Sequence, residues 1–212
     1  MSHQWPTVVR RSLVALATAF ALLVLVPTAG YAAPPNVRKP SPDLTASWWQ
    51  TFLALPASSV ERCDLGTGQV VFLGGTSGGT TTRSCTIPAG KSILVPLINV
   101  ECSQVEGNGD SYAQLKKCAH NFQKDFTNVS FVIDGTPVKP LQNLRVRSKL
   151  FRFTSVEGNA FGVVPATNTI SVSDGYWALI QPLSPGQHTI SFGGSYPPGP
   201  FNTQVTYHLT VR

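Results

Sequence analysis

Hydrophobic and polar residues alternate along most of the chain from residue 69 to the C-terminus, which is the period of strands that bury one face. The last segment is the clearest example, because Val205, Tyr207, Leu209 and Val211 alternate with polar residues. Gly, Pro, Asn and Asp separate the alternating segments, as turn residues do. The pattern predicts strands at 69–73, 81–87, 92–100, 128–133, 144–153, 169–172, 176–180, 188–192 and 203–211.

Three local signals refine these strands. Asp134-Gly135 predicts a two-residue hairpin turn, since a type I′ turn needs positive φ at both central positions. Pro96 lies inside a predicted strand but has no backbone N–H to donate to a neighbouring strand. This strand should therefore lie at a sheet edge or carry a bulge. The Gly-rich segment 74–79 precedes a strand and not a helix, so it predicts a hairpin loop and not a phosphate-binding loop.

One helix is expected before the strands. Ser41 can cap a helix that has Pro42 at its first position, and Pro56 prevents its continuation. The apolar residues between them recur at helical spacing, namely Leu44, Trp48, Phe52 and Leu55. Trp48 lies on this apolar stripe, which favours core packing over sugar stacking. Together the elements predict an all-β fold: an antiparallel β-sandwich, immunoglobulin-like or jelly-roll-like, with one N-terminal helix.

The N-terminus has the order of a secretory signal. Arg10 and Arg11 precede a hydrophobic run over 13–26, and small residues and Pro34-Pro35 follow it. The run is shorter than the ~20 residues that span a bilayer. We expect a signal peptide over 1–32 that is cleaved after Ala32, a Pro-rich linker over 33–42, and a β-sandwich domain over 43–212. The protein should therefore be secreted or lie in the periplasm or cell envelope, and the arginine pair leaves the general and twin-arginine routes open.

Charge narrows the choice of partners. The chain has 16 Lys and Arg against 10 Asp and Glu, a net charge of +6, which falls to +4 when Arg10 and Arg11 leave with the signal. The basic residues concentrate locally only at Arg145, Arg147, Lys149 and Arg152, which is typical of the solvated face of a strand. We therefore expect no nucleic-acid partner. No second apolar run is long enough to predict a membrane span in the mature protein.

The four cysteines lie in the exported part and are even in number, which favours two disulfides over a metal site. Four cysteines allow three connectivities. We favour Cys63–Cys85 with Cys102–Cys118, because each bond then closes one short excursion between predicted strands.

Several motifs resemble a family of secreted microbial single-domain proteins that has no known activity. They are Trp48-Trp49-Gln50 with Pro56, the segment 69–74, Arg83-Ser84-Cys85-Thr86-Ile87-Pro88-Ala89-Gly90-Lys91, Asp174-Gly175-Tyr176-Trp177, and Pro182-Leu183-Ser184-Pro185-Gly186-Gln187-His188-Thr189-Ile190. The resemblance implies one intact β-sandwich domain and transfers no catalytic residue. The last motif with the closing strand is also similar to the terminal hairpin of bacterial immunoglobulin-like domains.

Catalytic motifs are weak in this sequence. Ser77 stands in a Gly-rich loop and not in the strand-to-helix turn of a nucleophile elbow. The three histidines of the mature part do not have metal-site spacing, so we predict no metal site and no cofactor. Segment 106–110 has oxygen side chains at alternate positions but no closing bidentate Glu, so it favours a solvated loop and leaves calcium binding open. Glu101 is the exception among the acids, because it follows an apolar strand and shares its parity with Asn99. Asn99 and Glu101 are therefore the best catalytic candidates.

The segment between Cys102 and Cys118 is polar and is not needed by a sandwich core, so it is where we expect binding residues. The candidates are Glu106, Asn108, Asp110 and Tyr112. The sequence thus favours a non-catalytic binding or structural module of the extracellular space or cell envelope, whose ligand is a polysaccharide or a protein. The alternative is a small secreted hydrolase of envelope or environmental polymer, with Glu101 in its site. An inhibitor or adhesion protein that presents segment 104–117 to a protein partner is a third possibility.

Overall fold

The computed structural model describes residue 1 and residues 35–212 of the chain. The hydrophobic run of the expected signal peptide and its cleavage site lie outside the described residues. No helix within the described part is both long enough and apolar enough to cross a membrane.

The described domain is mostly β and has two sheets. The first sheet has the order β1-β10-β5-β3-β2, with β8 and β9 also paired to β10. Its strands are β1 (Val37–Arg38), β2 (Gly66–Thr67), β3 (Val70–Phe72), β5 (Ser92–Ser103), β8 (Arg145–Arg147), β9 (Phe151–Ser155) and β10 (Ala166–Ile180). Because β1 pairs with β10, the middle of the expected linker forms part of the sheet.

The second sheet has the order β4-β12-β11-β6-β7. Its strands are β4 (Gly79–Ile87), β6 (Thr127–Ile133), β7 (Thr136–Pro137), β11 (Gly186–Tyr196) and β12 (Phe201–Val211). The pairs β12–β4 and β3–β5 are parallel, so both sheets are mixed. The two-sheet, sandwich-like arrangement agrees with the prediction, but the expected antiparallel pairing holds only in part. The Gly-rich segment forms no hairpin, because β3 and β4 belong to different sheets and the chain crosses between them.

In two segments of the chain the strands differ from those that the sequence predicted. Segment 144–153 contains two strands, β8 and β9, preceded by the 3-10 helix η2 (Leu141–Leu144). Conversely, the two strands expected at 169–172 and 176–180 are one continuous strand, because Asp174-Gly175 stays extended within β10 and pairs with β5 and β8. Asp174 is fully buried there and is not a turn residue.

The turn at Asp134-Gly135 and the irregularity at Pro96 are both present as the sequence predicted. Asp134 and Gly135 have φ of 49° and 76°, and they join β6 to β7 in the expected hairpin. The register of β5 against β10 shifts at Pro96, where Trp177 pairs with Pro96 and Tyr176 with Ile98. The proline is therefore accommodated by a bulge.

The domain has two α-helices, α1 (Pro42–Leu53) and α2 (Tyr112–Gln123). The first is the expected N-terminal helix, and the second was not predicted. The Ser41 hydroxyl accepts a hydrogen bond from the Leu44 N–H and caps α1, as expected. Helix α2 occupies the segment expected to be a polar excursion. Its Leu115 and Ala119 are fully buried, so the segment is a part of the core and not a removable loop.

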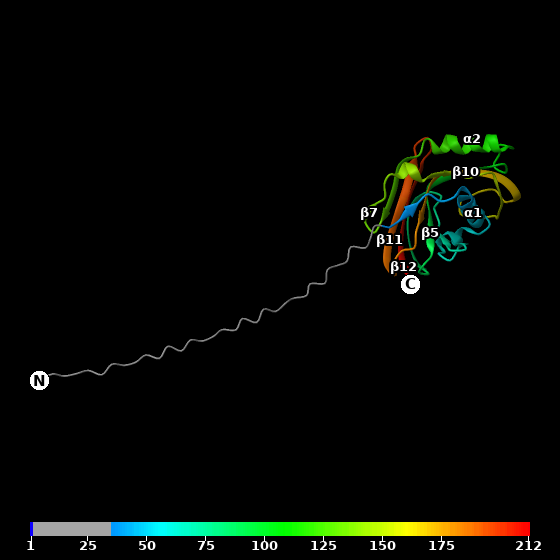
Figure 1. Cartoon of the computed structure of the whole chain (residues 1–212). Coiled ribbons are helices and arrows are strands. Elements are labelled where there is room, and N and C mark those ends of the chain that lie inside the picture. Colours follow the sequence, from blue (N-terminus) through cyan, green and yellow to red (C-terminus); the bar gives the residue numbers. More distant parts are fainter. Residues whose placement is uncertain (2–34) are drawn as a thin grey trace. The chain divides into compact units, whose positions relative to one another are not determined.

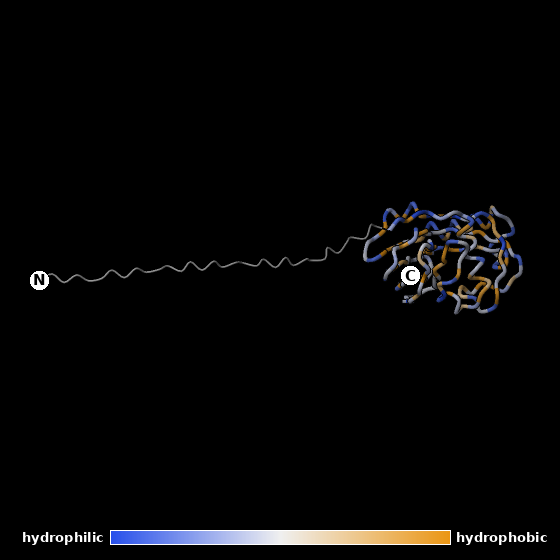
Figure 2. The backbone as a smooth tube through the Cα atoms, turned by 60° about the horizontal axis from the view of Figure 1, so that its bottom comes forward, coloured by the Kyte–Doolittle hydropathy of each residue, from blue (hydrophilic) through white to orange (hydrophobic). Residues whose placement is uncertain are grey.

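Hydrophobic side chains divide into three clusters. The largest lies between the two sheets and includes Phe131, Phe192 and Tyr207. A second joins α1 to the first sheet through Trp48, Trp177 and their neighbours, and a third joins α2 to β5 and β10. Figure 1 shows α1 on the side of β5 and β10 that lies away from β11 and β12. Orange and blue segments alternate along the strands in Figure 2, as expected of a two-faced sheet.

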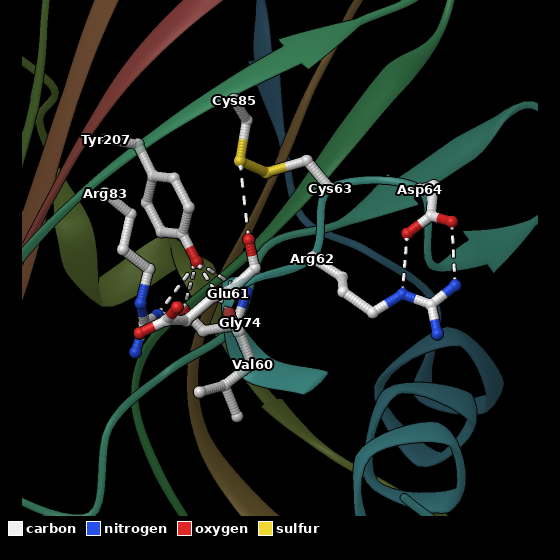
Figure 3. The surroundings of a disulfide bond; sticks show 9 residues. All are labelled: Val60, Glu61, Arg62, Cys63, Asp64, Gly74, Arg83, Cys85 and Tyr207. Carbon is white, nitrogen blue, oxygen red and sulfur yellow. Dashed lines mark hydrogen bonds and ion pairs between the residues drawn. A yellow bond between two sulfur atoms is a disulfide. The ribbon is translucent and has the colours of Figure 1, made fainter. Parts of the chain in front are cut away.

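Two disulfides, Cys63–Cys85 and Cys102–Cys118, have the expected pairing. Figure 3 shows that the first lies next to a hydrogen-bond centre formed by the Tyr207 hydroxyl. This hydroxyl accepts from the Gly74 N–H at 3.0 Å and from Arg83 Nη1 at 2.9 Å, and it lies 3.1 Å from the Gly74 carbonyl. Arg83 also donates to the Gly74 and Gly75 carbonyls. The centre holds the crossing segment against β4 and β12.

Candidate functional site: an acidic cleft and a basic groove

The polar ends of β5 and β10 present different residues on their two faces. Successive residues of a strand point to opposite sides of the sheet. Val100 and Cys102 belong to the cluster beneath α2, so Asn99, Glu101 and Ser103 lie on the other face, the side covered by α1. Opposite them in register stand Gly175, Ser173 and Ser171 of β10. The two faces carry two different candidate sites.

A tight turn after β5 brings Glu106 back over this face. The Asn108 N–H donates to the Ser103 carbonyl, and the Ser103 N–H donates in return to Asn108 Oδ1 at 3.0 Å. Gly107 has a φ of 74°, the left-handed conformation that glycine adopts without strain. The Ser103 hydroxyl then donates to the Glu106 carboxylate at 2.7 Å. Glu106 is thereby held near Glu101, where its carboxylate affects the pKa of Glu101.

Glu101 is an acid in an unfavourable place for a charge. Its side chain is 8% exposed, and the Ser171 hydroxyl donates to its Oε2. Burial, together with the neighbouring Glu106 carboxylate, raises the pKa of Glu101 well above its usual value, and the hydrogen bonds from Ser171 and Ser103 oppose this only in part. The neutral form of Glu101 is therefore favoured over a wider pH range than in a solvated glutamic acid.

These carboxyl groups border a cleft of about 310 Å³, called the acidic cleft below. Its walls include residues of β5, the edges of Trp48 and Trp49, and segments 75–77 and 201–203. No Lys or Arg lines it. The full lining is Trp48, Trp49, Gly75, Thr76, Ser77, Pro96, Leu97, Ile98, Asn99, Val100, Glu101, Glu106, Phe161, Val163, Phe201 and Thr203.

Asn99 joins the same cleft, as the shared parity with Glu101 predicted. It faces Gly175 across the strand pair, where a Cβ would come within 2.4 Å of the Asn99 backbone. Only glycine leaves room for Asn99 at this position. The two residues identified from the sequence therefore do lie together in one cleft, with Glu106 as a third member.

A second cavity of about 680 Å³ lies on the α2 face, and we call it the basic groove. It runs between α2 and β8, and none of its lining residues is acidic. The lining is Lys39, Tyr112, Ala113, Lys116, Lys117, His120, Arg145 and Arg147. Five Lys or Arg side chains and one histidine thus surround one cavity, which concentrates a positive potential there.

One buried acid organises the arginines of this groove. Asp174 accepts from Arg145 Nε at 3.0 Å and from Nη2 at 2.8 Å, and Arg147 Nη1 lies 3.8 Å away. These hydrogen bonds with Asp174 raise the pKa of Arg145 above its usual value. Arg145 Nη2 also lies 3.0 Å from His120 Nδ1. One carboxylate cannot neutralise the five cations, so the groove keeps a positive charge.

The four expected binding residues divide between these places. Glu106 enters the acidic cleft and Tyr112 lines the basic groove, where Lys116 lies 5.9 Å from its ring centre. Asn108 holds the turn, and Asp110 accepts from Gln104 Nε2 just before α2, so both have structural contacts. The sequence interpretation missed Lys116, Lys117 and His120, whose helical spacing would have placed them on one face.

Comparisons with known proteins do not identify the chain. No family model matches it, and no curated protein matches it. A chain in the solved structure of PbICP-C in complex with falcipain-2 aligns with 12% sequence identity, covering 68% of this chain and 100% of that chain, with a TM-score of 0.28. So low a score carries no argument about fold or function.

Proposed function

We propose that this protein is an extracellular or cell-envelope binding module that holds an anionic polysaccharide in the basic groove. The observation that carries the proposal is the groove itself, in which five Lys or Arg side chains meet without an acidic lining residue. Lysines carry point charges that suit carboxylate, sulfate or phosphate groups of variable geometry. The paired disulfides are compatible with an oxidising compartment, which supports the expected export.

The structure favours binding over the alternative of polysaccharide hydrolysis. Glycoside hydrolases separate their two carboxyl groups by about 5 to 9.5 Å, so that a water or a sugar carbon fits between them. Glu101 is only 8% exposed and its Oε2 accepts from the Ser171 hydroxyl, while Glu106 accepts from Ser103, so both acids are held by other groups of the protein. Asn99 supplies no second acid.

The test is a binding assay with polymers that differ in charge and not in length. The protein is titrated with dextran sulfate, polygalacturonate and neutral dextran at two salt concentrations. We expect both anionic polymers to bind, neutral dextran not to bind, and affinity to fall as salt rises, because ions screen exposed charges. The polymer that binds more tightly identifies the anionic group.

Charge-matched variants locate the binding surface. Lys116→Gln with Lys117→Gln should weaken polyanion binding about 10-fold or more, since both side chains line the groove. Arg62→Gln with Lys91→Gln removes the same charge outside the groove and is the control. Arg145 and Arg147 are left intact because Asp174 would otherwise be a buried, unpaired charge. Equal weakening by both double variants, or equal affinity for neutral dextran, would refute the proposal.

A further inference from the structure

The acidic cleft contains an unusual concentration of buried oxygen atoms without partners. Among the described residues, seven buried side-chain nitrogen or oxygen atoms lack a hydrogen-bond partner. Three of them belong to residues that line this cleft, namely Trp49 Nε1, Asn99 Oδ1 and Glu101 Oε1, and a fourth, Ser173 Oγ, lies on the neighbouring strand β10. Glu101 and Ser173 face each other directly in the β5–β10 register, and Asn99 precedes Glu101 on the same face. Buried polar atoms are nearly always paired, so such a cluster needs an explanation.

The charges in the acidic cleft indicate what kind of ligand could pair with these oxygen atoms. Two carboxyl groups meet there, one of them nine-tenths buried, and no basic side chain lines the cavity. The acceptor oxygens of Glu101, Glu106 and Asn99 match the ligand preference of a hard divalent cation, whereas the Trp49 N–H is a donor and takes no part in such a site. Such a cation would neutralise both carboxylates and give Glu101 Oε1 and Asn99 Oδ1 a partner. We infer that Glu101, Glu106, Asn99 and Ser173 form a calcium-binding site.

Ser173 supplies evidence that is independent of the acids. Its side chain is fully buried on β10, its hydroxyl has no partner, and it lies opposite Glu101. Within the described residues no three His, Cys, Asp or Glu side chains converge, so the site depends on neutral oxygens to supplement two carboxylates. Calcium accepts amide and hydroxyl oxygens as well as carboxylates, whereas zinc prefers nitrogen and sulfur. The adjoining cleft gives the ion a path from solvent.

The geometry of the turn also suits the proposal. The mutual hydrogen bonds of Ser103 and Asn108 fix the turn, and the Cys102–Cys118 disulfide attaches β5 to α2 immediately beside it. Glu106 is therefore positioned before any ion binds, which reduces the ordering that binding would require. With only two carboxylates we expect the weak affinity of extracellular calcium modules, Kd about 0.1 to 1 mM.

The experiment uses the full folded protein after treatment with EDTA. Calcium chloride is added alone up to 10 mM while the melting temperature is recorded, with magnesium chloride as a parallel arm. We expect calcium to raise the melting temperature in a saturable manner, because it binds only the native state. Magnesium should act less strongly, since it requires near-ideal octahedral geometry.

Three variants locate the ion. Glu106→Gln and Glu101→Gln should each abolish the calcium-dependent rise, whereas Glu157→Gln, an exposed acid outside the cleft, should leave it unchanged. Glu106 is exposed, so its variant remains informative if Glu101→Gln does not fold. Terbium, which replaces calcium, should give luminescence sensitised by the tryptophans that line the cleft, and Glu106→Gln should remove it. No calcium-dependent rise up to 10 mM, or an equal rise in wild type and Glu106→Gln, would overturn the inference.

Discussion

Tyr207→Phe tests whether the hydroxyl centre between the sheets stabilises the domain. The ring is fully buried and lies parallel to the ring of Phe192, and phenylalanine preserves both features. The substitution removes only the hydroxyl, whose pKa is raised by burial, so the group that is lost is neutral. What changes is the set of partners around it (Figure 3).

The magnitude follows from those partners. The Gly74 N–H, which donates to the hydroxyl from a buried position, loses its acceptor, and an unsatisfied buried donor costs about 1 to 3 kcal/mol. Arg83 keeps the Gly74 and Gly75 carbonyls as acceptors, so its loss is smaller. We expect a total of about 2 to 3 kcal/mol. For a domain of 150 to 250 residues, this lowers the melting temperature by about 4 to 12 °C.

Urea unfolding followed by tryptophan fluorescence measures the free energy of unfolding, and an unchanged m-value confirms that the unfolded state is comparable. Tyr196→Phe is the matched control, since within the described chain its hydroxyl has no recorded hydrogen bond, and it should change stability by less than about 0.5 kcal/mol. If Tyr207→Phe is as stable as the control, the hydroxyl centre does not contribute to stability and our reasoning about it is wrong.

Three further predictions concern α2 and the acidic cleft. Leu115→Ala should destabilise the domain by about 2 to 5 kcal/mol in urea unfolding, because the side chain is fully buried, whereas Lys124→Ala at the end of the helix should have little effect. Replacing both Cys102 and Cys118 with alanine should cost about 3 kcal/mol in the same assay, and it should also weaken polyanion binding, since α2 carries half of the basic groove. In EDTA, the wild type should lose stability relative to Glu101→Gln as pH rises from about 4.5 through the raised pKa of Glu101. The unfolded chain releases this proton first, so parallel stability curves from pH 4 to pH 9 would contradict the buried acid.

Local patterns predicted the elements more reliably than their partners. Period-two alternation located β12, the Asp-Gly pair located the β6–β7 turn, and Pro96 indicated the bulge, because each depends on neighbouring residues. The parallel pairings could not be predicted, since they depend on which sheet a strand joins after a crossover. Asp174-Gly175 resembled a turn only because its partner, Arg145, is distant in sequence.

The candidate sites were likewise predictable where they depend on neighbouring residues and not where they depend on contacts distant in sequence. Strand parity placed Asn99 and Glu101 together, but the return of Glu106 depends on one turn whose hydrogen bonds are invisible in the sequence. Helix α2 was missed although its start carries a capping signal, with the Ser111 hydroxyl accepting from the Gln114 N–H. Its polar residues, which include Lys116 and Lys117, surround a narrow apolar stripe and hid it. The basic groove brings α2 to β8, and only tertiary packing creates it.

The parallel pairing of β4 with β12 has a consequence for the order of folding. Arg83 and Tyr207 are register partners separated by 124 residues, and β12 is the central link between β4 and β11. Early in synthesis β4 has no neighbour in its sheet, and closing so long a loop is entropically slow. Strand β4 therefore joins the second sheet only when the final strand arrives. A chain stopped before Phe201 would expose the edges of both β4 and β11, and we expect it to aggregate instead of forming a smaller stable domain.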